Sequence, residues 1–298
     1  MKKSAISLAL SDISDEFVLE AAQPKRRSPA LPILAAAACV CLVLLCAFAL
    51  RAGDPSGIAP QPPISGELTV TIPLVDKDIG SPINEACMVA FFIYEGRFYE
   101  SYDAAPIALR GEKLGTVNGS IDEWSSPTDY AELSGSIGGD FYAVEGYDPG
   151  FLLCKDLSDG EVMLYINNRG ITVHKGAELF DEGFRLSGSY ASVTGMSRYD
   201  WFYSTGNFTD LTEHRDVLDA FLAALNEGTF VRTQDILPEG ASNVYDSLES
   251  HHLYFTKPDG VKVHLRLLDG GYVQPDRFRD VCVQMDKGAF DAVTALMG

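Results

Sequence analysis

The longest apolar run in the chain extends from Ala30 to Leu50, and Pro32 is its only interruption. The run is 21 residues long and contains no charged residue. An α-helix rises about 1.5 Å per residue, so a helix of this length spans about 30 Å, the thickness of the hydrocarbon core of a bilayer. The pattern therefore predicts one transmembrane helix, at residues 30–51.

Basic residues are concentrated before this run, where Lys25, Arg26 and Arg27 stand together, while Arg51 follows it. Because positively charged flanks stay on the cytoplasmic side, we expect the N-terminus in the cytoplasm and the larger part of the chain outside. The alternative is secretion after cleavage near Ala49, since Ala47-Phe48-Ala49 has the small-x-small form of a cleavage site. Cleaved signals usually have apolar cores of only about 7–15 residues, which favours the anchor.

The chain beyond the apolar run divides into a linker and a domain. Residues 53–66 contain four prolines and three glycines, as in a semi-extended linker, which we place at residues 52–66. Residues 67–298 show short alternating segments separated by turn residues. We expect an extracytoplasmic α+β domain of short antiparallel strands with two or three helices, with a division into two subdomains near residues 185–210 as an option.

The first clear hairpin joins residues 88–94 to residues 97–102. Glu95-Gly96 predicts a two-residue turn, because glycine readily takes a positive φ. This register pairs Ile93 with Phe98 and Phe91 with Glu100, so we expect the odd positions of the first strand to face the core.

A second hairpin joins residues 253–257 to residues 261–267 across Pro258-Asp259-Gly260. A three-residue loop pairs Lys257 with Val261, whereas a two-residue loop would divide the apolar residues between both faces of the sheet. We therefore predict the three-residue loop, with Gly260 at positive φ. One face then holds Leu253, Phe255, Val261, Val263, Leu265 and Leu267.

The remaining elements follow from the same two periodicities. Strands are expected at residues 67–75, 141–144, 151–154, 162–166, 171–174 and 271–274, of which the middle four suggest a meander. Helices are expected at residues 211–227 and near residues 290–296, with a helical turn at residues 177–181. Residues 104–139 are expected to be mainly loop, with one helical turn near residues 130–133.

The peptide before the apolar run, residues 1–29, is expected to hold a short amphipathic helix. Ser14 is a suitable N-cap, and Pro24 ends the helix. Two interpretations remain: a frayed tail near the membrane, or a peptide that folds on a cytosolic protein partner. In the second case the contacts would come from Ile13, Phe17, Val18 and Ala21.

The charge beyond Arg51 is strongly negative, with 17 basic and 38 acidic residues and a net charge of −21. Such a surface repels phosphate backbones, so nucleic acid is excluded as a partner. Three cysteines lie within the apolar run, and only Cys87, Cys154 and Cys282 lie beyond it. Three widely spaced cysteines form at most one disulfide, and free thiols are expected.

No sequence motif of a known catalytic or cofactor site occurs in a usable context, so we expect no enzyme, no cofactor and no metal. Weaker candidates are a Cys154–His174 pair, a calcium loop from Asp76 that lacks its final glutamate, and a histidine pair. The hairpin register makes His252 and His264 diagonal neighbours about 7–8 Å apart, and we expect both imidazoles to be exposed. Ligand-contacting aromatics are expected among Trp124, Tyr199, Trp201 and Tyr203.

Several segments resemble known proteins. They are DISDEFVLEA (residues 12–21) with the following KRR, YEGRFY (94–99), GEKLG (111–115), IDEW (121–124) and VEGYDP (144–149). Over about a third of the chain, these segments and their layout resemble a loose group of uncharacterised single-pass membrane proteins of Gram-positive, clostridial-type bacteria. Some members look like regulators that hold a sigma factor at the membrane. The resemblance implies the same topology.

These observations predict a membrane-anchored extracytoplasmic binding or sensing module of a bacterial cell envelope. The first alternative is an anti-sigma-like regulator that binds a cytosolic factor through residues 4–23. The second is an envelope hydrolase with an unrecognised site. The extracellular ligand is not identified by the sequence.

Overall fold

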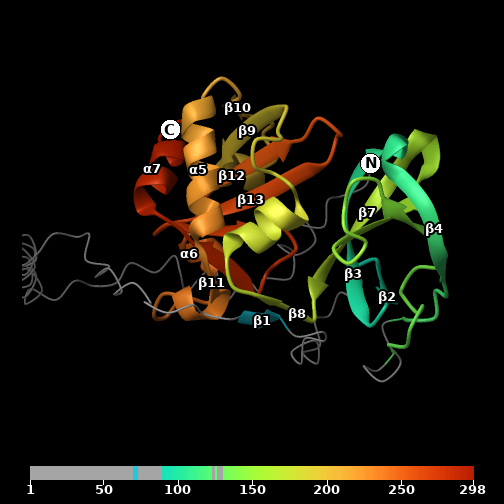
Figure 1. The fold of residues 1–298 in the computed structure, drawn as a ribbon. Helices are drawn as coiled ribbons and strands as arrows, with labels where there is room; N and C mark the ends of the chain where they lie inside the picture. The colour runs from blue at the N-terminus through green and yellow to red at the C-terminus, as the bar shows by residue number, and fades with distance from the viewer. Residues whose placement is uncertain (1–69, 73–88, 123–124, 126–129) are drawn as a thin grey trace, which may run out of the picture. The chain divides into compact units, whose positions relative to one another are not determined.

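A computed structural model describes residues 70–72, 89–122, 125 and 130–298, all within one compact unit, residues 66–298 (Figure 1). The N-terminal peptide, the apolar run and the linker lie outside the described residues. Among the helices that are described, none is long and apolar enough to cross a membrane. The described fold is a mixed α+β fold whose paired strands are antiparallel, which confirms the coarse prediction for this part of the chain.

The first sheet has six strands, and its central part is the predicted meander. The order is β2 (Phe91–Tyr94), β3 (Arg97–Pro106), β7 (Glu161–Arg169), β6 (Leu152–Asp156), β5 (Gly139–Val144) and β4 (Arg110–Val117). The fourth strand predicted for the meander is β8 (Ile171–Val173), which leaves this sheet and pairs with β1 (Val70–Ile72).

Residues 133–136 close the six-stranded sheet on itself. The Ile93 amide donates to the carbonyl of Ser134 at 2.8 Å, and the Asn118 amide donates to the carbonyl of Leu133 at 2.8 Å. This segment therefore lies between β2 and the end of β4, the two strands that would otherwise be edges. Each strand contributes one side chain to the buried cluster of the sheet: Phe92, Tyr99, Val117, Phe141, Leu153 and Tyr165.

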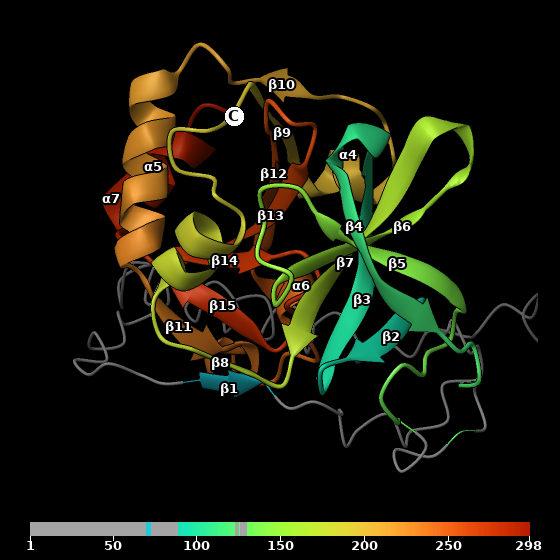
Figure 2. The same cartoon turned by 45° about the vertical axis from the view of Figure 1, so that its right-hand side comes forward.

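The second sheet has seven strands and carries the two longest helices. The order is β10 (Thr209–Asp210), β9 (Ser192–Ser197), β12 (Glu249–Thr256), β13 (Lys262–Leu268), β14 (Tyr272–Pro275), β15 (Val281–Gln284) and β11 (Thr229–Arg232). Helices α5 (Arg215–Glu227) and α7 (Lys287–Thr294) lie side by side over this sheet (Figures 1 and 2). The helix lies within the range predicted at residues 211–227, and its apolar stripe packs in the same core as β12 and β13: Leu218, Phe221, Leu222 and Leu225.

Short helical segments connect the strands. They are η3 (Ile107–Leu109), η5 (Ser158–Gly160), the π-helix η6 (Glu178–Gly183), α4 (Arg198–Phe202), η7 (Thr233–Ile236) and α6 (Val244–Ser247). The segment η6 overlaps the helical turn expected at residues 177–181.

The structure confirms the register of the β12–β13 hairpin. Leu253 pairs with Leu265, Phe255 pairs with Val263, and the Lys257 amide donates to the carbonyl of Val261 at 2.9 Å. Gly260 has φ +92°, and all six apolar residues assigned to one face are fully buried. Parity of the apolar pattern was therefore enough to choose the loop length.

The β2–β3 register is also confirmed, but the expectation about its faces was wrong. Phe91 pairs with Glu100, and Ile93 pairs with Phe98. The odd residues are buried, yet the even residue Phe92 is fully buried too and belongs to the cluster inside the closed sheet. Phe91 is covered on the other face by Phe98, at 4.6 Å, and Tyr130, at 5.6 Å between ring centroids. Both faces of β2 are therefore buried, so alternation along this strand carries no information about the core.

The expectation that residues 104–139 are mainly loop was wrong for its first half. β3 continues to Pro106, and residues 110–117 form β4. β4 contains two glycines and mostly polar residues, and the only one of its residues that is buried is Val117. The sequence of such a strand has no apolar alternation to detect.

Gly135 provides a test of ring closure. A Cβ at this position would lie 2.4 Å from the carbonyl oxygen of Phe91 and 2.8 Å from Cβ of Phe92. We expect Gly135→Ala to lower the free energy of unfolding of the full chain by about 1–3 kcal/mol, because the closing segment must move away from β2. Urea denaturation in detergent, followed by far-UV circular dichroism, measures the change.

The matched control is Gly288→Ala, in the first turn of α7. Its Cβ would meet only Oδ1 of Asp286, at 3.1 Å, and alanine is favoured over glycine in a helix by about 1 kcal/mol. We expect this variant to be at least as stable as the parent. Equal stability of the two variants would contradict the proposed closure.

Candidate functional site

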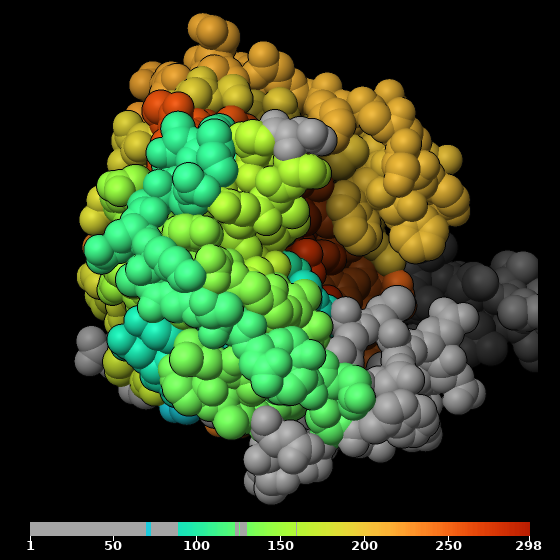
Figure 3. Space-filling model, turned by 90° about the vertical axis from the view of Figure 1, so that its right-hand side faces the viewer, coloured from blue at the N-terminus to red at the C-terminus, as the bar shows by residue number. Residues whose placement is uncertain are grey.

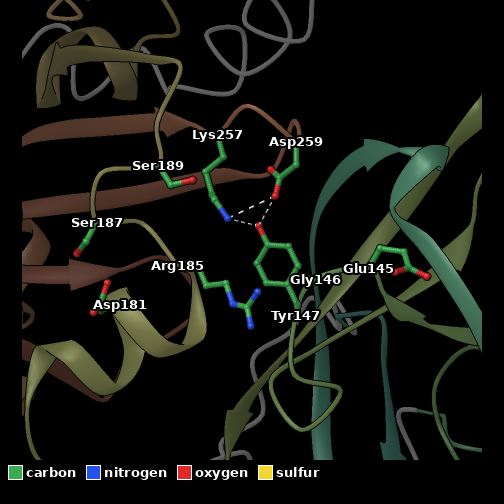
Figure 4. A pocket seen from close by; sticks show the side chains of 9 residues that line it. All are labelled: Glu145, Gly146, Tyr147, Asp181, Arg185, Ser187, Ser189, Lys257 and Asp259. Atoms are coloured by element: carbon green, nitrogen blue, oxygen red, sulfur yellow. Dashed lines mark hydrogen bonds and ion pairs between the residues drawn. The ribbon is translucent and has the colours of Figure 1, made fainter.

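A polar pocket of about 340 Å³ lies where three loops meet (Figure 4). The turn after β5 contributes residues 145–147, the segment from η6 to β9 contributes a second group, and the β12–β13 turn contributes Lys257 and Asp259. The pocket has no aliphatic side chain in its lining, which consists of Glu145, Gly146, Tyr147, Asp181, Arg185, Ser187, Ser189, Lys257 and Asp259. Its volume is at the lower end of the range for small-molecule sites, about 300–1,000 Å³, but its lining is far more polar than is usual for them.

Tyr147, Lys257 and Asp259 form a connected group in this pocket. The Tyr147 hydroxyl donates to Oδ2 of Asp259 at 2.8 Å, and Nζ of Lys257 donates to the same hydroxyl. Nζ of Lys257 also forms an ion pair with Asp259 at 3.4 Å. The Lys257 side chain is only 4% exposed, so its ammonium group is held mainly by these two partners.

Burial and charge determine the proton state of this group. Burial lowers the pKa of Lys257, and Asp259 opposes this effect. Burial, and then the hydrogen bond to Asp259, raise the pKa of Tyr147. Tyr147 is therefore a neutral donor at neutral pH, and it is not a phenolate base. The arrangement offers fixed charges and donors to a ligand, but no activated nucleophile.

Arg185 is the unusual residue of the pocket. It is a non-glycine residue with φ +53°, and its guanidinium forms no hydrogen bond or ion pair with any described residue. Glu145 and Asp181 also have side chains without such a partner among the described residues. Figure 4 shows the guanidinium beside Tyr147, with Asp181 and Glu145 on opposite sides of it. Within the described part of the chain, the pocket thus presents one cation and two anions that have no partner.

The aromatic candidates from the sequence differ in position. Tyr199 and Tyr203 are exposed and touch each other, with ring centroids 4.7 Å apart. Trp201 turns toward the sheet and stacks on His252 at 4.6 Å. Trp124 and the N-terminal candidates Ile13, Phe17, Val18 and Ala21 lie outside the described residues.

The two histidines are diagonal neighbours as predicted, but the expectation that they are exposed was wrong. The His252 side chain is 0% exposed, and its Nδ1 lies 2.9 Å from Nε2 of His264. Trp201 covers His252 on one side, and Tyr254 stacks on His264 at 4.4 Å on the other. The hairpin register places them on one face, whereas α4, which covers that face, is too short to be recognised by periodicity.

A buried charge network surrounds these histidines. Glu249, with a side chain 2% exposed, binds Arg266 at 3.0 Å and Arg198 at 3.4 Å. Arg266 also packs over the Trp201 ring at 5.0 Å and approaches Asp276 at 3.5 Å. The charges are satisfied within the protein, so this network fixes α4 on the sheet and leaves no open site.

The remaining chemical candidates do not form a site in the described residues. The Cys154 thiol donates to the carbonyl of Ala143, whereas His174 binds Glu178 at 3.0 Å. Cys154 and Cys282 are free and buried, and burial raises the pKa of each thiol to about 12. No group of three or more potential metal ligands is found in the described part of the chain. The calcium-loop candidate and Cys87 lie outside it.

The sequence did not indicate the pocket. Its residues come from three segments far apart in the chain, and none of them forms a recognisable motif. The only signals were the turns at residues 148–150 and 258–260, which mark loops without showing that they meet. The positive φ of Arg185 cannot be read from its residue type, because arginine has no preference for that conformation.

His264 makes the stability of the protein depend on pH. Burial lowers its pKa from 6.5 to about 4, although Asp276 acts in the opposite direction. Between these two values the unfolded chain binds a proton that the folded protein does not, so the free energy of unfolding falls as the pH falls. We expect a loss of about 3 kcal/mol from this residue between about pH 6.5 and about pH 4, measured by urea denaturation.

His264→Gln should remove this part of the pH dependence, while the exposed His214→Gln should leave it unchanged. Glu249, whose pKa is lowered by the nearby His252 and Arg266 against the effect of burial, adds a loss of the same sign that both variants keep. An unchanged pH slope in His264→Gln would show that His264 is not held neutral by the fold.

Comparison with known proteins gives no relative from which a function can be transferred. No family model, no curated protein and no solved structure matches the chain. The function is therefore inferred from the residues of the site.

Proposed function

We propose that this protein is a membrane-anchored extracytoplasmic binding or sensing module of a bacterial cell envelope, without catalytic activity. The anchor is the apolar run Ala30–Leu50, with the N-terminus in the cytoplasm. In this proposal the polar pocket beside Arg185 binds a small hydrophilic ligand that carries both a negative and a positive charge.

The observation that carries the proposal is the set of three charged side chains that have no hydrogen bond or ion pair with a described residue, Arg185, Glu145 and Asp181. Arg185 keeps a left-handed backbone conformation, which costs a non-glycine residue about 1–2 kcal/mol. Strain of this kind tends to be found at ligand-binding positions. This conformation also ends η6, because it lets the Leu186 amide donate to the carbonyl of Phe180 at 2.8 Å. The argument for a ligand therefore depends on the Arg185 guanidinium, which has no hydrogen bond or ion pair with a described residue.

The charges indicate the class of ligand. A carboxylate fits the guanidinium of Arg185, which offers several donors in one plane, and the Lys257 ammonium lies on the other side of Tyr147 (Figure 4). An ammonium group fits Asp181 or Glu145. A cavity of about 340 Å³ has the volume of roughly eleven water molecules. It can therefore hold a ligand with about as many non-hydrogen atoms. A dipeptide zwitterion has this size and both charges.

Alanylalanine is the probe that tests this proposal. Isothermal titration of the full chain in detergent should show binding, and N-acetylation or C-terminal amidation of the dipeptide should each weaken it about tenfold or more. Each change removes one charged partner, which is worth about 1.5–3 kcal/mol when hydrogen-bonded. Absence of alanylalanine binding, or equal affinity for all three probes, would contradict the zwitterion assignment. Conversion of the dipeptide would contradict the absence of catalysis.

Three variants separate recognition from folding. Arg185→Gln should lose the affinity for alanylalanine, and Arg232→Gln, at an exposed arginine elsewhere, should keep it. Arg185→Gly should also lose binding while its free energy of unfolding stays equal or rises by up to about 1 kcal/mol, because glycine relieves the strained φ. Lower stability of Arg185→Gly would assign Arg185 a structural role.

A further inference from the structure

Four large aromatic side chains stand exposed on α4 and the loop that follows it. Tyr199, Phe202, Tyr203 and Phe208 are 66%, 64%, 62% and 56% exposed, and we call them the aromatic platform. Phe202 and Tyr203 meet edge to face with centroids 5.1 Å apart, and Tyr203 also touches Tyr199. In Figure 3 the gold lobe at the upper right has the colour of this segment, and the surface is hollowed between it and the green strands.

Asp200 holds the loop of the platform in one conformation. Its carboxylate accepts the hydroxyl of Ser197 at 2.6 Å, the hydroxyl of Thr205 at 2.6 Å and the side-chain amide of Asn207 at 2.9 Å. These bonds lower the pKa of Asp200, the bond from Ser197 most strongly, so the carboxylate stays charged. The loop is therefore ordered before any partner binds, which reduces the entropy cost of binding.

The platform is also fixed from beneath. Trp201 stacks on buried His252, and Arg198 binds Asp246 at 2.7 Å as well as Glu249. Phe208 meets Tyr254 edge to face, two residues along the same strand from His252. The exposed rings thus surround an anchored tryptophan and belong to one surface, not to a loose loop.

Area and charge restrict the partner. Aromatic side chains offer about 150–250 Å² each, so the exposed part of the platform is on the order of 500 Å². A stable protein interface needs about 800 Å² from each partner, which makes a second copy or another folded protein a poor fit. Arg198 is paired with Asp246, and Asp200 keeps its negative charge while it accepts hydrogen bonds from three uncharged groups, so neither offers a free cation to an anionic partner.

We propose that the aromatic platform binds a neutral polysaccharide strand of the cell envelope. Sugar rings present a face of C–H groups that packs on an aromatic ring, and a rim of hydroxyls that takes hydrogen bonds. The Tyr199 and Tyr203 hydroxyls have no partner in the described structure and are available for that rim. β1, where the described domain begins, and β10, which follows the platform, lie at opposite ends of the domain in Figures 1 and 2.

The test is retention of the full chain, in detergent, on insoluble chitin, cellulose and mannan. We expect retention on at least one of them, and at least a tenfold loss of affinity in the double variant Phe202→Ala with Tyr203→Ala. Leu157→Ala, which removes an exposed apolar side chain on the other sheet, should bind like the parent. Asp200→Ala keeps all four rings but frees the loop, and we expect it to weaken binding at least threefold.

The same experiments distinguish a polysaccharide from other partners of the aromatic platform. Retention on none of the three polysaccharides, or retention that survives loss of the rings, overturns the proposal. A concentration-dependent dimer in analytical ultracentrifugation that the double variant abolishes would assign the platform to a second copy instead. Arg185→Gln should not change retention on the polysaccharides. The polysaccharide proposal and the proposed ligand binding in the pocket can therefore fail independently of each other.

Discussion

The register of the β12–β13 hairpin determines both faces of the seven-stranded sheet and one wall of the pocket. The three-residue turn directs the odd residues, among them Phe255 and Leu265, into the core beneath α5. The same turn directs His252 and His264 to the opposite face, and it delivers Lys257 and Asp259 to the pocket. A slip of one residue would exchange the two faces, placing imidazoles among leucines. Gly260 is needed at this turn because of its positive φ and because a Cβ at this position would lie 2.7 Å from Cδ of Pro106 in β3.

On the polar face of this sheet, ion pairs and stacked rings hold the side chains in place, whereas the opposite face is an apolar core. Glu249 and Arg266 are a largely buried pair, and such pairs contribute little net stability because desolvation offsets their attraction. Removing one partner is nevertheless expensive, since the other charge stays buried. The network therefore specifies the position of α4 more than it increases stability. Trp201 connects this network to the surface, because it contacts Arg266 and His252 beneath the exposed rings.

Sequence patterns predicted the parts of this fold that one strand pair or one helix face determines. The β12–β13 parity, the β2–β3 register and the stripe of α5 are local properties. Ring closure by residues 133–136 is not, since it depends on backbone groups of distant residues such as Ile93 and Asn118. Sequence patterns could not predict the pocket either, because its charged residues come from three separate loops. The exposed tyrosines were identified as candidates from composition, whereas the role of Trp201 beneath them required the structure.

The closed sheet has a consequence for how partners can be recognised. An exposed strand edge lets a partner chain add a strand through backbone hydrogen bonds, with little demand on side chains. Residues 133–136 bond to the edge of β2 and to Asn118, which directly follows β4, and in the second sheet the edge strand β10 has two residues, while Lys175 bridges β11 at Thr229. The two large sheets thus offer little template for strand addition, or for the stacking of one copy on another into fibres. At the edges described above, side chains contribute more to the selection of a partner than backbone hydrogen bonds do.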